Sequence, residues 1–407
     1  MIIAACLGAF TMLNARDFVW ANALGAGSND LGCRITVNTF GEVYTTGYFR
    51  GTVDFDPGPG TALLTASGGS DIFILKMDAS GSFLWAQAFG GAADDFGRNI
   101  TLDASGDVYT IGHFRGTADF DPGVGTANLT ANGGSDIFIQ KMHASGVFEW
   151  AKAFGGFWDD GGRSISIDAA GNIYTTGHFH GTVDFDPGAG IFNQTSSGGR
   201  DIFILKMDPL GDLDWVKTFV SNLADNGNSI MVDTSGNVYT AGIFRGTVDF
   251  DPGAGTTNLS AVGSQDIFIQ KMDTSGNMVW AKSFGGTLNE LARSIAVDDS
   301  GNVYTTGAFQ GTVDFDPGAG TANLSAVGGY DVFIQKMDAS GNFLWAKTFG
   351  NPSPDSGIST TVDSAGNVYT TGFFQGVVDF GLESYKVWLT INNENLDTNH
   401  LWVEALA

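Results

Sequence analysis

The stretch GNVYTTGAFQGTVDFDPGAGTANLSAVGGYDVFIQKMDASGNFLWAKTFG, residues 301–350, contains most of one unit that recurs along the chain. The tryptophan of its last segment returns every 65 residues, at Trp20, Trp85, Trp150, Trp215, Trp280 and Trp345. The first aspartate of DFDPG keeps the same step, at Asp54, Asp119, Asp184, Asp249, Asp314 and Asp379. A fixed period without insertions is the signature of a repeat architecture.

Each repeat has the pattern of short strands separated by turns. Segments of alternating β-branched and aromatic residues are bounded by Asp- and Gly-rich turns. They predict four strands per repeat. In the repeat that contains the stretch quoted above and the residues just before it, these strands are residues 294–299, 302–309, 331–338 and 343–350. Gly accounts for 59 of 407 residues, about twice the usual share. No segment keeps a 3.6-residue period, so we expect almost no helix.

Four antiparallel strands at a fixed period predict the blades of a β-propeller, and therefore an all-β fold. The chain contains six units of first and second strands, which predicts six four-stranded blades. The period exceeds the 40–50 residues common in propellers. The surplus lies at residues 314–329, which we expect to form a long excursion between the second and third strands.

The two ends of the chain both contain candidates for the outer strands of the sixth blade. Residues 1–25 predict closing strands, although their apolar start also fits a remnant of a signal segment. Residues 26–382 hold the propeller repeats. Residues 383–407 form a strand-like tail, in which HLWVEALA is similar to FVWANALG near the N-terminus. Either end can supply outer strands for the sixth blade, so closure and addition of spare strands to another copy both stay open.

The repeat resembles a known family. GNVYTTG, VDFDPGAGTANLSAVGGYDVFIQKMDASGNFLWAKTFG and their copies are similar to the bacterial SBBP β-propeller repeat over roughly residues 17–380. This resemblance implies a propeller fold and an extracellular or cell-surface location, and usually no assigned chemistry. The family name implies seven blades, whereas the number of repeats predicts six.

The charge of the chain excludes some partners. Acidic residues outnumber basic ones 44 to 19, a formal net charge of −25, and Lys and Arg form no cluster. Nucleic acid is therefore excluded as a partner, because phosphate binding needs clustered positive charge. No apolar run is long enough to span a membrane. The acidity favours cations as partners, or serves only to keep the protein soluble.

The DFDPG motif is the candidate metal site. In a strand, residues i and i+2 face the same side, so its two aspartates are predicted to share a hard cation such as Ca²⁺. The alternative is structural, because Asp before Pro-Gly sets up a tight turn. The candidate ligands are Asp54, Asp56, Asp119, Asp121, Asp184, Asp186, Asp249, Asp251, Asp314 and Asp316.

A second set of acids precedes each first strand. Its members are Asp30, Asp95, Asp160, Asp225, Glu290 and Asp355. They have two interpretations, a cation-binding mouth or caps for backbone N–H groups between blades. Arg98, Arg163 and Arg293 follow three residues after such acids, a spacing that allows them to pair with the acids.

Other positions vary while the scaffold stays fixed, which is where a ligand surface can be built or where sequence drifts. After YTTG or its equivalent come Tyr48, His113, His178, Ile243, Ala308 and Phe373, and two residues later Arg50, Arg115, His180, Arg245, Gln310 and Gln375. His178 and His180 are a candidate metal pair, although two ligands do not make a site.

No motif of an enzyme is present, and the carboxylates lie in repeated turns, which argues against acid–base chemistry. We therefore expect no enzyme, and no catalytic or organic cofactor-binding residues. The expected function is an extracellular structural, adhesion or binding propeller. Self-assembly by strand addition and stabilisation by Ca²⁺ are further expectations. Its expected partners are other copies of itself or a cell-surface polymer. The alternative is a propeller hydrolase or lyase that acts on a polysaccharide at one face.

Overall fold

The computed structural model describes residues 2–5, 20–27, 29–378, 386–389 and 399–406. Every regular element within these residues is a β-strand, which confirms the all-β class. Among them there is no helix of the length and apolarity needed to cross a bilayer. Asp379, which the sequence analysis placed in the repeat pattern, lies outside the described residues.

The chain divides into two compact units. The first comprises Met1–Ser196 and Leu205–Val216, and the second comprises Ser197–Ile204 and Lys217–Ala407. Both are built from four-stranded antiparallel sheets, the blades, in which the strands follow one another in chain order except in the last sheet.

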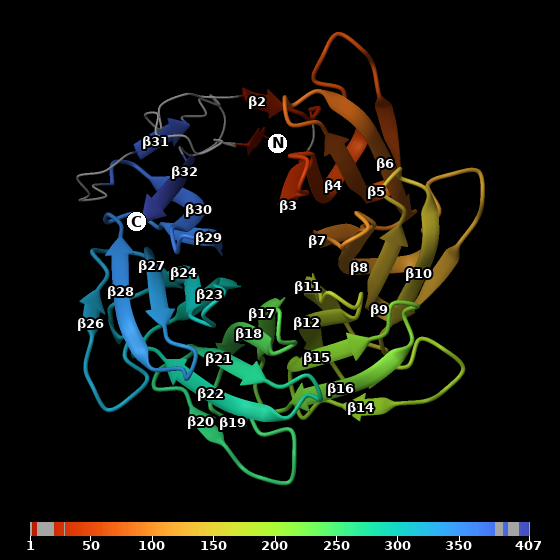
Figure 1. Ribbon diagram of the computed structural model, residues 1–407. Coiled ribbons are helices and arrows are strands. Elements are labelled where there is room, and N and C mark those ends of the chain that lie inside the picture. The colour runs from red at the N-terminus through yellow and green to blue at the C-terminus, as the bar shows by residue number, and fades with distance from the viewer. Residues whose placement is uncertain (1, 6–19, 28, 379–385, 390–398, 407) are drawn as a thin grey trace. The chain divides into compact units, whose positions relative to one another are not determined.

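Two complete blades lie in the first unit (Figure 1). Their strands are β3 (Leu31–Val37), β4 (Val43–Asp54), β5 (Leu63–Met77) and β6 (Phe83–Gly91), then β7 (Phe96–Leu102), β8 (Val108–Asp119), β9 (Asn128–Met142) and β10 (Phe148–Phe154). The two blades are joined into one eight-stranded sheet, because Gly90 and Gly91 of β6 pair with Asp119 and Ala118 of β8. A separate two-stranded sheet consists of β1 (Ile2–Ala5) and β2 (Trp20–Ala23).

Three further sheets keep the sequential order. Their strands are β11 (Gly161–Ile167), β12 (Ile173–Phe179), β15 (Asp201–Met207) and β16 (Leu213–Phe219); β17 (Asn226–Val232), β18 (Val238–Phe244), β21 (Asp266–Met272) and β22 (Met278–Phe284); and β23 (Glu290–Val297), β24 (Val303–Phe309), β27 (Asp331–Met337) and β28 (Phe343–Phe349). The first of these sheets takes residues from both units, and the other two belong to the second unit.

The surplus segment of each repeat forms a hairpin of its own. In three repeats it consists of β13 (Thr182–Asp184) with β14 (Asn193–Thr195), β19 (Thr247–Asp249) with β20 (Asn258–Ser260), and β25 (Thr312–Asp314) with β26 (Asn323–Ser325). In the first two blades the same pairing belongs to the longer strands β4–β5 and β8–β9, after a register shift at the glycine of GTVD or GTAD. The predicted excursion is therefore a regular extension of the second and third strands.

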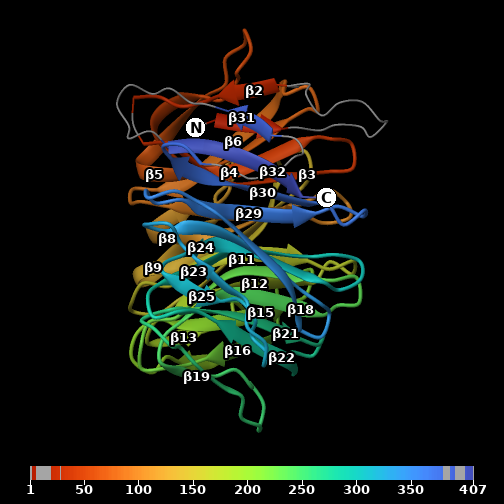
Figure 2. The same cartoon turned by 90° about the vertical axis from the view of Figure 1, so that its left-hand side faces the viewer.

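The last sheet departs from the chain order. It contains β29 (Ser356–Val362), β30 (Val368–Gln375), β31 (Lys386–Leu389) and β32 (Asn399–Leu406). The final strand β32 pairs with β30, and β31 lies outside β32 (Figure 2). The sequence of β32 is similar to that of a fourth strand, yet β32 occupies the third position of the sheet. It does so because its backbone pairs with the edge of β30.

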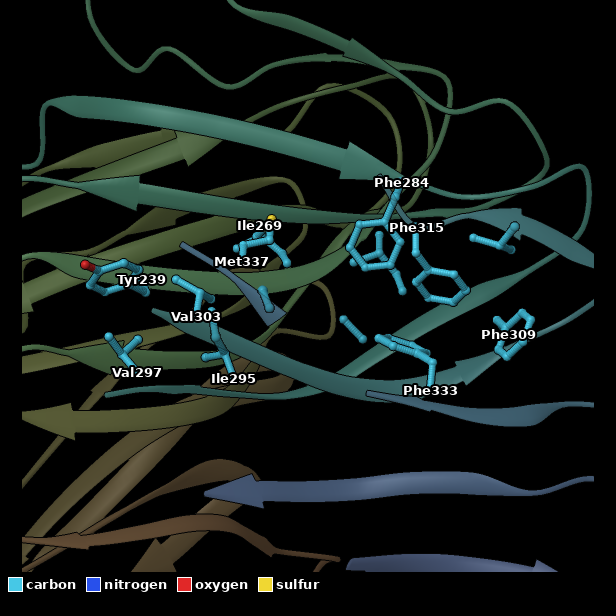
Figure 3. Packing of buried hydrophobic residues seen from close by; sticks show 14 residues of the cluster. Tyr239, Ile269, Phe284, Ile295, Val297, Val303, Phe309, Phe315, Phe333 and Met337 are labelled. Carbon is cyan, nitrogen blue, oxygen red and sulfur yellow. The ribbon is translucent and has the colours of Figure 1, made fainter. Parts of the chain in front are cut away.

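Aromatic rings from successive blades make the core. In the second unit, the ring of Phe284 at the end of β22 lies 5.4 Å from that of Phe315 and 5.8 Å from that of Phe333 in the next blade. Figure 3 shows these rings together, with Phe309 beyond them. Each fully buried Phe contributes about 1.5–3 kcal/mol. The clusters therefore bind each blade to the next through the hydrophobic effect.

Candidate functional site

The first aspartate of each DFDPG motif is held by backbone N–H groups. In the fifth copy, Asp314 is the last residue of β25, and its Oδ1 accepts the N–H of Asp316 at 3.1 Å and that of Ala322 at 2.8 Å. The same two contacts, at closely similar distances, hold Asp54, Asp119, Asp184 and Asp249. This carboxylate therefore closes the base of the hairpin.

The second aspartate shapes the tip of the turn. Asp316 Oδ1 accepts the N–H of Gly318 at 2.8 Å, which is an Asx turn. Its other oxygen lies 2.1 Å from the position that a β-carbon on Gly320 would occupy. Only glycine fits there, which explains the second Gly of DPGxG. The equivalent glycines, with Asp oxygens at 2.0–2.1 Å, are Gly60, Gly125, Gly190 and Gly255.

These contacts correct the geometry assumed for the metal site. The strand ends at the first aspartate and the second lies in the turn, so the two carboxylates are not successive residues on one face of a strand. Within the described residues there is no group of three or more His, Cys, Asp or Glu side chains that could hold a metal ion. The observed contacts fit the turn-forming interpretation, and calcium binding stays a prediction.

The acids before the first strands cap backbone groups. Asp160 Oδ2 accepts the N–H of Gly156, and Oδ1 accepts the N–H of His180, both at 2.7 Å. Asp160 thus ties the end of one blade to the second strand of the next. Asp30, Asp95 and Asp355 make the equivalent pair of backbone contacts. Asp225 accepts the hydroxyl of Ser221 and the N–H of Arg245, and Glu290 caps Gly286. These contacts fit the capping interpretation.

The arginine next to one of these acids lies elsewhere. The guanidinium of Arg98 lies 5.1 Å from the centre of the Phe96 ring. The two carboxylate oxygens of Asp95 accept the backbone N–H groups of Gly91 and Arg115. The ion pairs at these junctions instead join Arg50 to Asp94 at 2.6 Å and Arg115 to Asp159 at 2.9 Å. The candidate pairing of Arg98 with Asp95 is therefore wrong, since backbone donors already satisfy that carboxylate.

Within the described residues, a second buried acid lies beside every cap except Asp30, and the sequence analysis missed it. It is the aspartate that begins the DIFI or DVFI strand, for example Asp136, which is 1% exposed. Burial raises the pKa of Asp136 to about 6, and burial with a smaller repulsion from Asp136 raises that of Asp160 to about 7. The available signal was a charged residue repeated at the head of an otherwise apolar strand.

The variable positions that follow YTTG divide into a buried set and an exposed set. His178, Ile243 and Ala308 are buried, and burial lowers the pKa of His113 to about 3. These residues pack within the protein, so they offer little surface to a ligand. Of the second set, Arg50 and Arg115 are exposed.

His178 and His180 contact different neighbours. His178 packs against Gly161, where its Cε1 lies 2.7 Å from the position of a β-carbon. The ring of His180 stacks on the indole of Trp158, with centroids 5.2 Å apart and planes at 24°. The structure therefore assigns the two imidazoles to separate packing contacts.

Phe157, Trp158 and His180 form an aromatic patch in the first unit. The side chains of Phe157 and Trp158 are 72% and 52% exposed, and their rings meet edge to face at 5.3 Å. Gly181 lets the indole approach the backbone, because its β-carbon position lies 2.9 Å from Trp158 Cδ1. The indole is thus fixed by its neighbours while much of its surface faces solvent.

The aromatic pair occurs in one repeat, at two loop positions whose residues vary between the repeats. The equivalent residues are Ala92 and Ala93 in one repeat, and Thr287 and Leu288 in another. The sequence reasoning missed the patch because it looked for variation only after YTTG. Aligning the repeats at FGGFWDDGGR would have revealed it.

Comparisons with known proteins agree with the fold and assign no activity. The profile of SBBP, described as a beta-propeller repeat, matches residues 279–308. The chain is 24% identical to an uncharacterized WD repeat-containing protein, L264, of Acanthamoeba polyphaga mimivirus, over 88% of this chain and 31% of that protein. It is 23% identical to the regulatory protein FlaEY of Caulobacter vibrioides, over 58% of this chain and 24% of that protein.

The chain thus spans about a third or less of the length of the curated relatives it matches. Among solved structures, a glucose dehydrogenase is similar with a TM-score of 0.37 and 9% identity, over 85% of this chain and 95% of that one. A likeness this weak carries no functional argument. The predicted resemblance to the SBBP repeat is confirmed by the profile match at residues 279–308, which span less than one of the 65-residue repeats.

Proposed function

We propose that this chain is an extracellular adhesion module that binds a polysaccharide through its aromatic patch and does not catalyse a reaction. The proposal includes a propeller of six blades, since six pairs of first and second strands occur in the described residues. The observation that carries it is the exposed indole of Trp158, held by His180 and Phe157 on a scaffold whose other repeats lack it.

The chemistry of the patch suits a sugar chain. A rigid, exposed aromatic face packs against the C–H groups of a pyranose ring at little entropic cost, because its side chain is already ordered. Polar groups lie close by, since Asp159 follows Trp158 and pairs with Arg115 at 2.9 Å. Both members of this pair are about half exposed, at 41% and 52%, and are available to sugar hydroxyls.

Affinity electrophoresis through gels that contain purified bacterial and host extracellular polysaccharides tests this proposal. We expect at least one polysaccharide to retard the protein and Trp158→Ala to abolish the retardation. Leu288→Ala is the matched control, because Leu288 is also exposed over a glycine of the equivalent loop, Gly311. Unchanged retardation of Trp158→Ala, or no retardation by any polysaccharide, would contradict the proposal, and release of new sugar ends would favour the enzyme.

Self-assembly is a second proposed property, and it rests on a surplus of strands. The described residues contain six inner pairs, yet seven outer pairs if β1–β2 is counted with β32–β31 and the five regular ones. A spare outer pair can complete a blade of another copy by strand addition. We expect native mass spectrometry to show oligomers of the full chain and monomers after deletion of residues 383–407. Monomers in both samples would contradict this assembly.

A further inference from the structure

At four blade junctions, two buried carboxyl groups lie near enough for their charges to interact, and one or both of them pack against a glycine. A junction is the point where the fourth strand of one blade passes to the first strand of the next. The pairs are Asp71 with Asp95, Asp136 with Asp160, Asp266 with Glu290, and Asp331 with Asp355. All eight side chains belong to residues that are at most 1% exposed.

The glycine makes the close approach possible. At the first junction, Asp71 Oδ1 and Asp95 Oδ2 lie 3.0 and 2.9 Å from the position of a β-carbon on Gly90. At the second, that position on Gly155 lies 2.2 Å from Asp136 Cγ. Any side chain at these glycines would displace a carboxylate, so the sequence Phe-Gly at the end of the fourth strand keeps room for the pair.

Each of these junctions leaves one carboxylate oxygen without a hydrogen-bond partner. The oxygens are Asp71 Oδ1, Asp136 Oδ1, Glu290 Oε1 and Asp331 Oδ1. The opposite acid is held by backbone N–H groups, as Asp160 is by Gly156 and His180. An ionised oxygen that is buried and unsatisfied is strongly unfavourable, so a hydrogen-bond donor is required at this point.

A fifth junction supplies that donor from the protein. Val220 and Ser221 replace the usual pair of glycines beside Asp201 and Asp225. The N–H of Ser221 donates to Asp201 Oδ1 at 2.9 Å, and its hydroxyl donates to Asp225 Oδ2 at 2.6 Å. Both carboxylates therefore have hydrogen-bond donors where the serine is present. The other four junctions lack such a donor for one carboxylate oxygen.

The surroundings favour a proton over a metal ion in this role. The charged groups that act on Asp160 include Asp136 and Asp159, and Asp159 is paired with Arg115, while the ring of His180 stacks on Trp158. Asp94 similarly adds to the negative charge at Asp95, and Tyr330 lies near Glu290. Backbone N–H groups already point at the carboxylates, whereas Ca²⁺ needs six to eight oxygen ligands.

We propose that the two carboxyl groups at each of these four junctions share one proton, so that a carboxyl–carboxylate hydrogen bond joins neighbouring blades and is lost in alkaline solution. One member of the pair is then a protonated carboxyl group, which donates a hydrogen bond to the carboxylate of the other member. When the pH rises, this proton passes to bulk water and leaves two carboxylates that repel each other. Burial raises the pKa of Asp95 to about 6 and that of Glu290 to about 7, which places the change near neutral pH.

Infrared difference spectroscopy of the folded, full-length protein tests the proposal directly. We expect a carbonyl band of protonated carboxyl groups at about pH 6 that disappears by about pH 9. Asp136→Asn should reduce this band by about a quarter, since one of four shared protons is removed. Absence of the band at about pH 6 would overturn the proposal and leave a buried water molecule as the donor.

Thermal unfolding of the same variant gives a second, independent measurement. The amide of Asp136→Asn can keep its oxygen on the N–H of Asn132 and place its NH₂ where the shared proton lies. We expect its unfolding temperature at about pH 8 to exceed that of the natural sequence. Asp201→Asn is the matched control, and it should lower the temperature, because at Asp201 both oxygens already accept N–H groups. An equal loss in both variants would contradict the shared proton.

Discussion

The indole N–H of Trp280 donates a hydrogen bond of 3.2 Å to the backbone oxygen of Ala339, which lies in the turn between the third and fourth strands of the next blade. Gly341 of that turn packs over the same indole. Trp20 makes the equivalent bond to Ala79 at 3.1 Å. The repeated tryptophan is therefore a contact between blades, which is why it keeps the 65-residue step.

Trp280→Phe is expected to destabilise the protein more than Trp85→Phe. Both changes shorten a ring at the same place in the repeat, but the Nε1 of Trp85 is buried without a hydrogen-bond partner. The difference should be about 1 kcal/mol, the net value of one hydrogen bond. Urea unfolding of the two variants measures it, and a larger loss for Trp85→Phe would show that the bond to Ala339 contributes nothing.

Gly320→Ala should destabilise the excursion of its blade. The new β-carbon would lie 2.1 Å from Asp316 Oδ2, so the Asx turn must open or the backbone must shift. We expect a loss of about 1–3 kcal/mol, as for other steric conflicts in well-packed regions. Gly27→Ala is the control, because nothing lies within 4 Å of its β-carbon position. Equal stability of the two variants in thermal unfolding would refute the packing argument.

Asp314→Asn should keep most of the stability that Asp314→Ala loses. The amide oxygen of Asn can still accept the N–H groups of Asp316 and Ala322, whereas Ala leaves both without an acceptor. We expect a cost of about 1–3 kcal/mol for the alanine variant. A calcium site predicts the opposite, since a neutral amide replaces a charged ligand.

A chelator separates the two interpretations of DFDPG in the unmodified protein. From the backbone contacts we expect an unchanged unfolding temperature when a calcium chelator is added. Native mass spectrometry in the same solutions should give one mass. A lower unfolding temperature together with the loss of up to five bound ions would establish the calcium sites instead.

The stability of the fold is expected to decrease as the pH rises from about 5 to about 8. The raised pKa of Asp160, about 7, and of Asp355, about 6, mean that the folded state binds more protons than the unfolded state in this range. Their contribution is complete below the unfolded pKa and is lost as the pH rises through the folded value. Unfolding temperatures across this range give the measurement, and a temperature that rises instead would show that the buried pairs are ionised.

At lower pH a different set of carboxyl groups determines how the stability of the fold changes. The backbone N–H of Asn342 holds the pKa of Asp338 below its usual range, and hydrogen bonds from Ser80 do the same for Asp78. Such groups stabilise the fold above their unfolded pKa, and this contribution is lost as the pH falls through the folded value. We therefore expect the unfolding temperature to decline again in strong acid.

Much of the fold could be predicted from the sequence, because its turns and strands depend on short-range contacts. The turn around Gly301 is an example, since its φ of +78° suits glycine and Asp298 accepts the N–H groups of Ser300 and Asn302. The strands and the hairpin of DFDPG follow from similar short-range contacts. The period then repeats this local solution, so four-stranded sheets were predictable without any knowledge of long-range packing.

The candidate sites were less accessible to the same reasoning. The DFDPG aspartates were found, but their strand geometry was not, because the strand ends at the first aspartate, two residues before the second. Asp136 was not identified as a site residue, since nothing in its own segment reveals the carboxylate of Asp160. Trp158 was overlooked because its partner His180 lies on another strand and stacks on it only in the folded protein.

The sequence by itself determined the all-β repeat, its 65-residue step and the chemistry of its turns, because these depend on neighbouring residues and on alternation along a strand. Only the tertiary structure decided that acids meet in pairs at the blade junctions, that an indole is held exposed above Gly181, and that β32 lies beside β30. Each of these features joins residues from different strands, and such contacts are fixed by the packing of the blade, which local sequence does not specify.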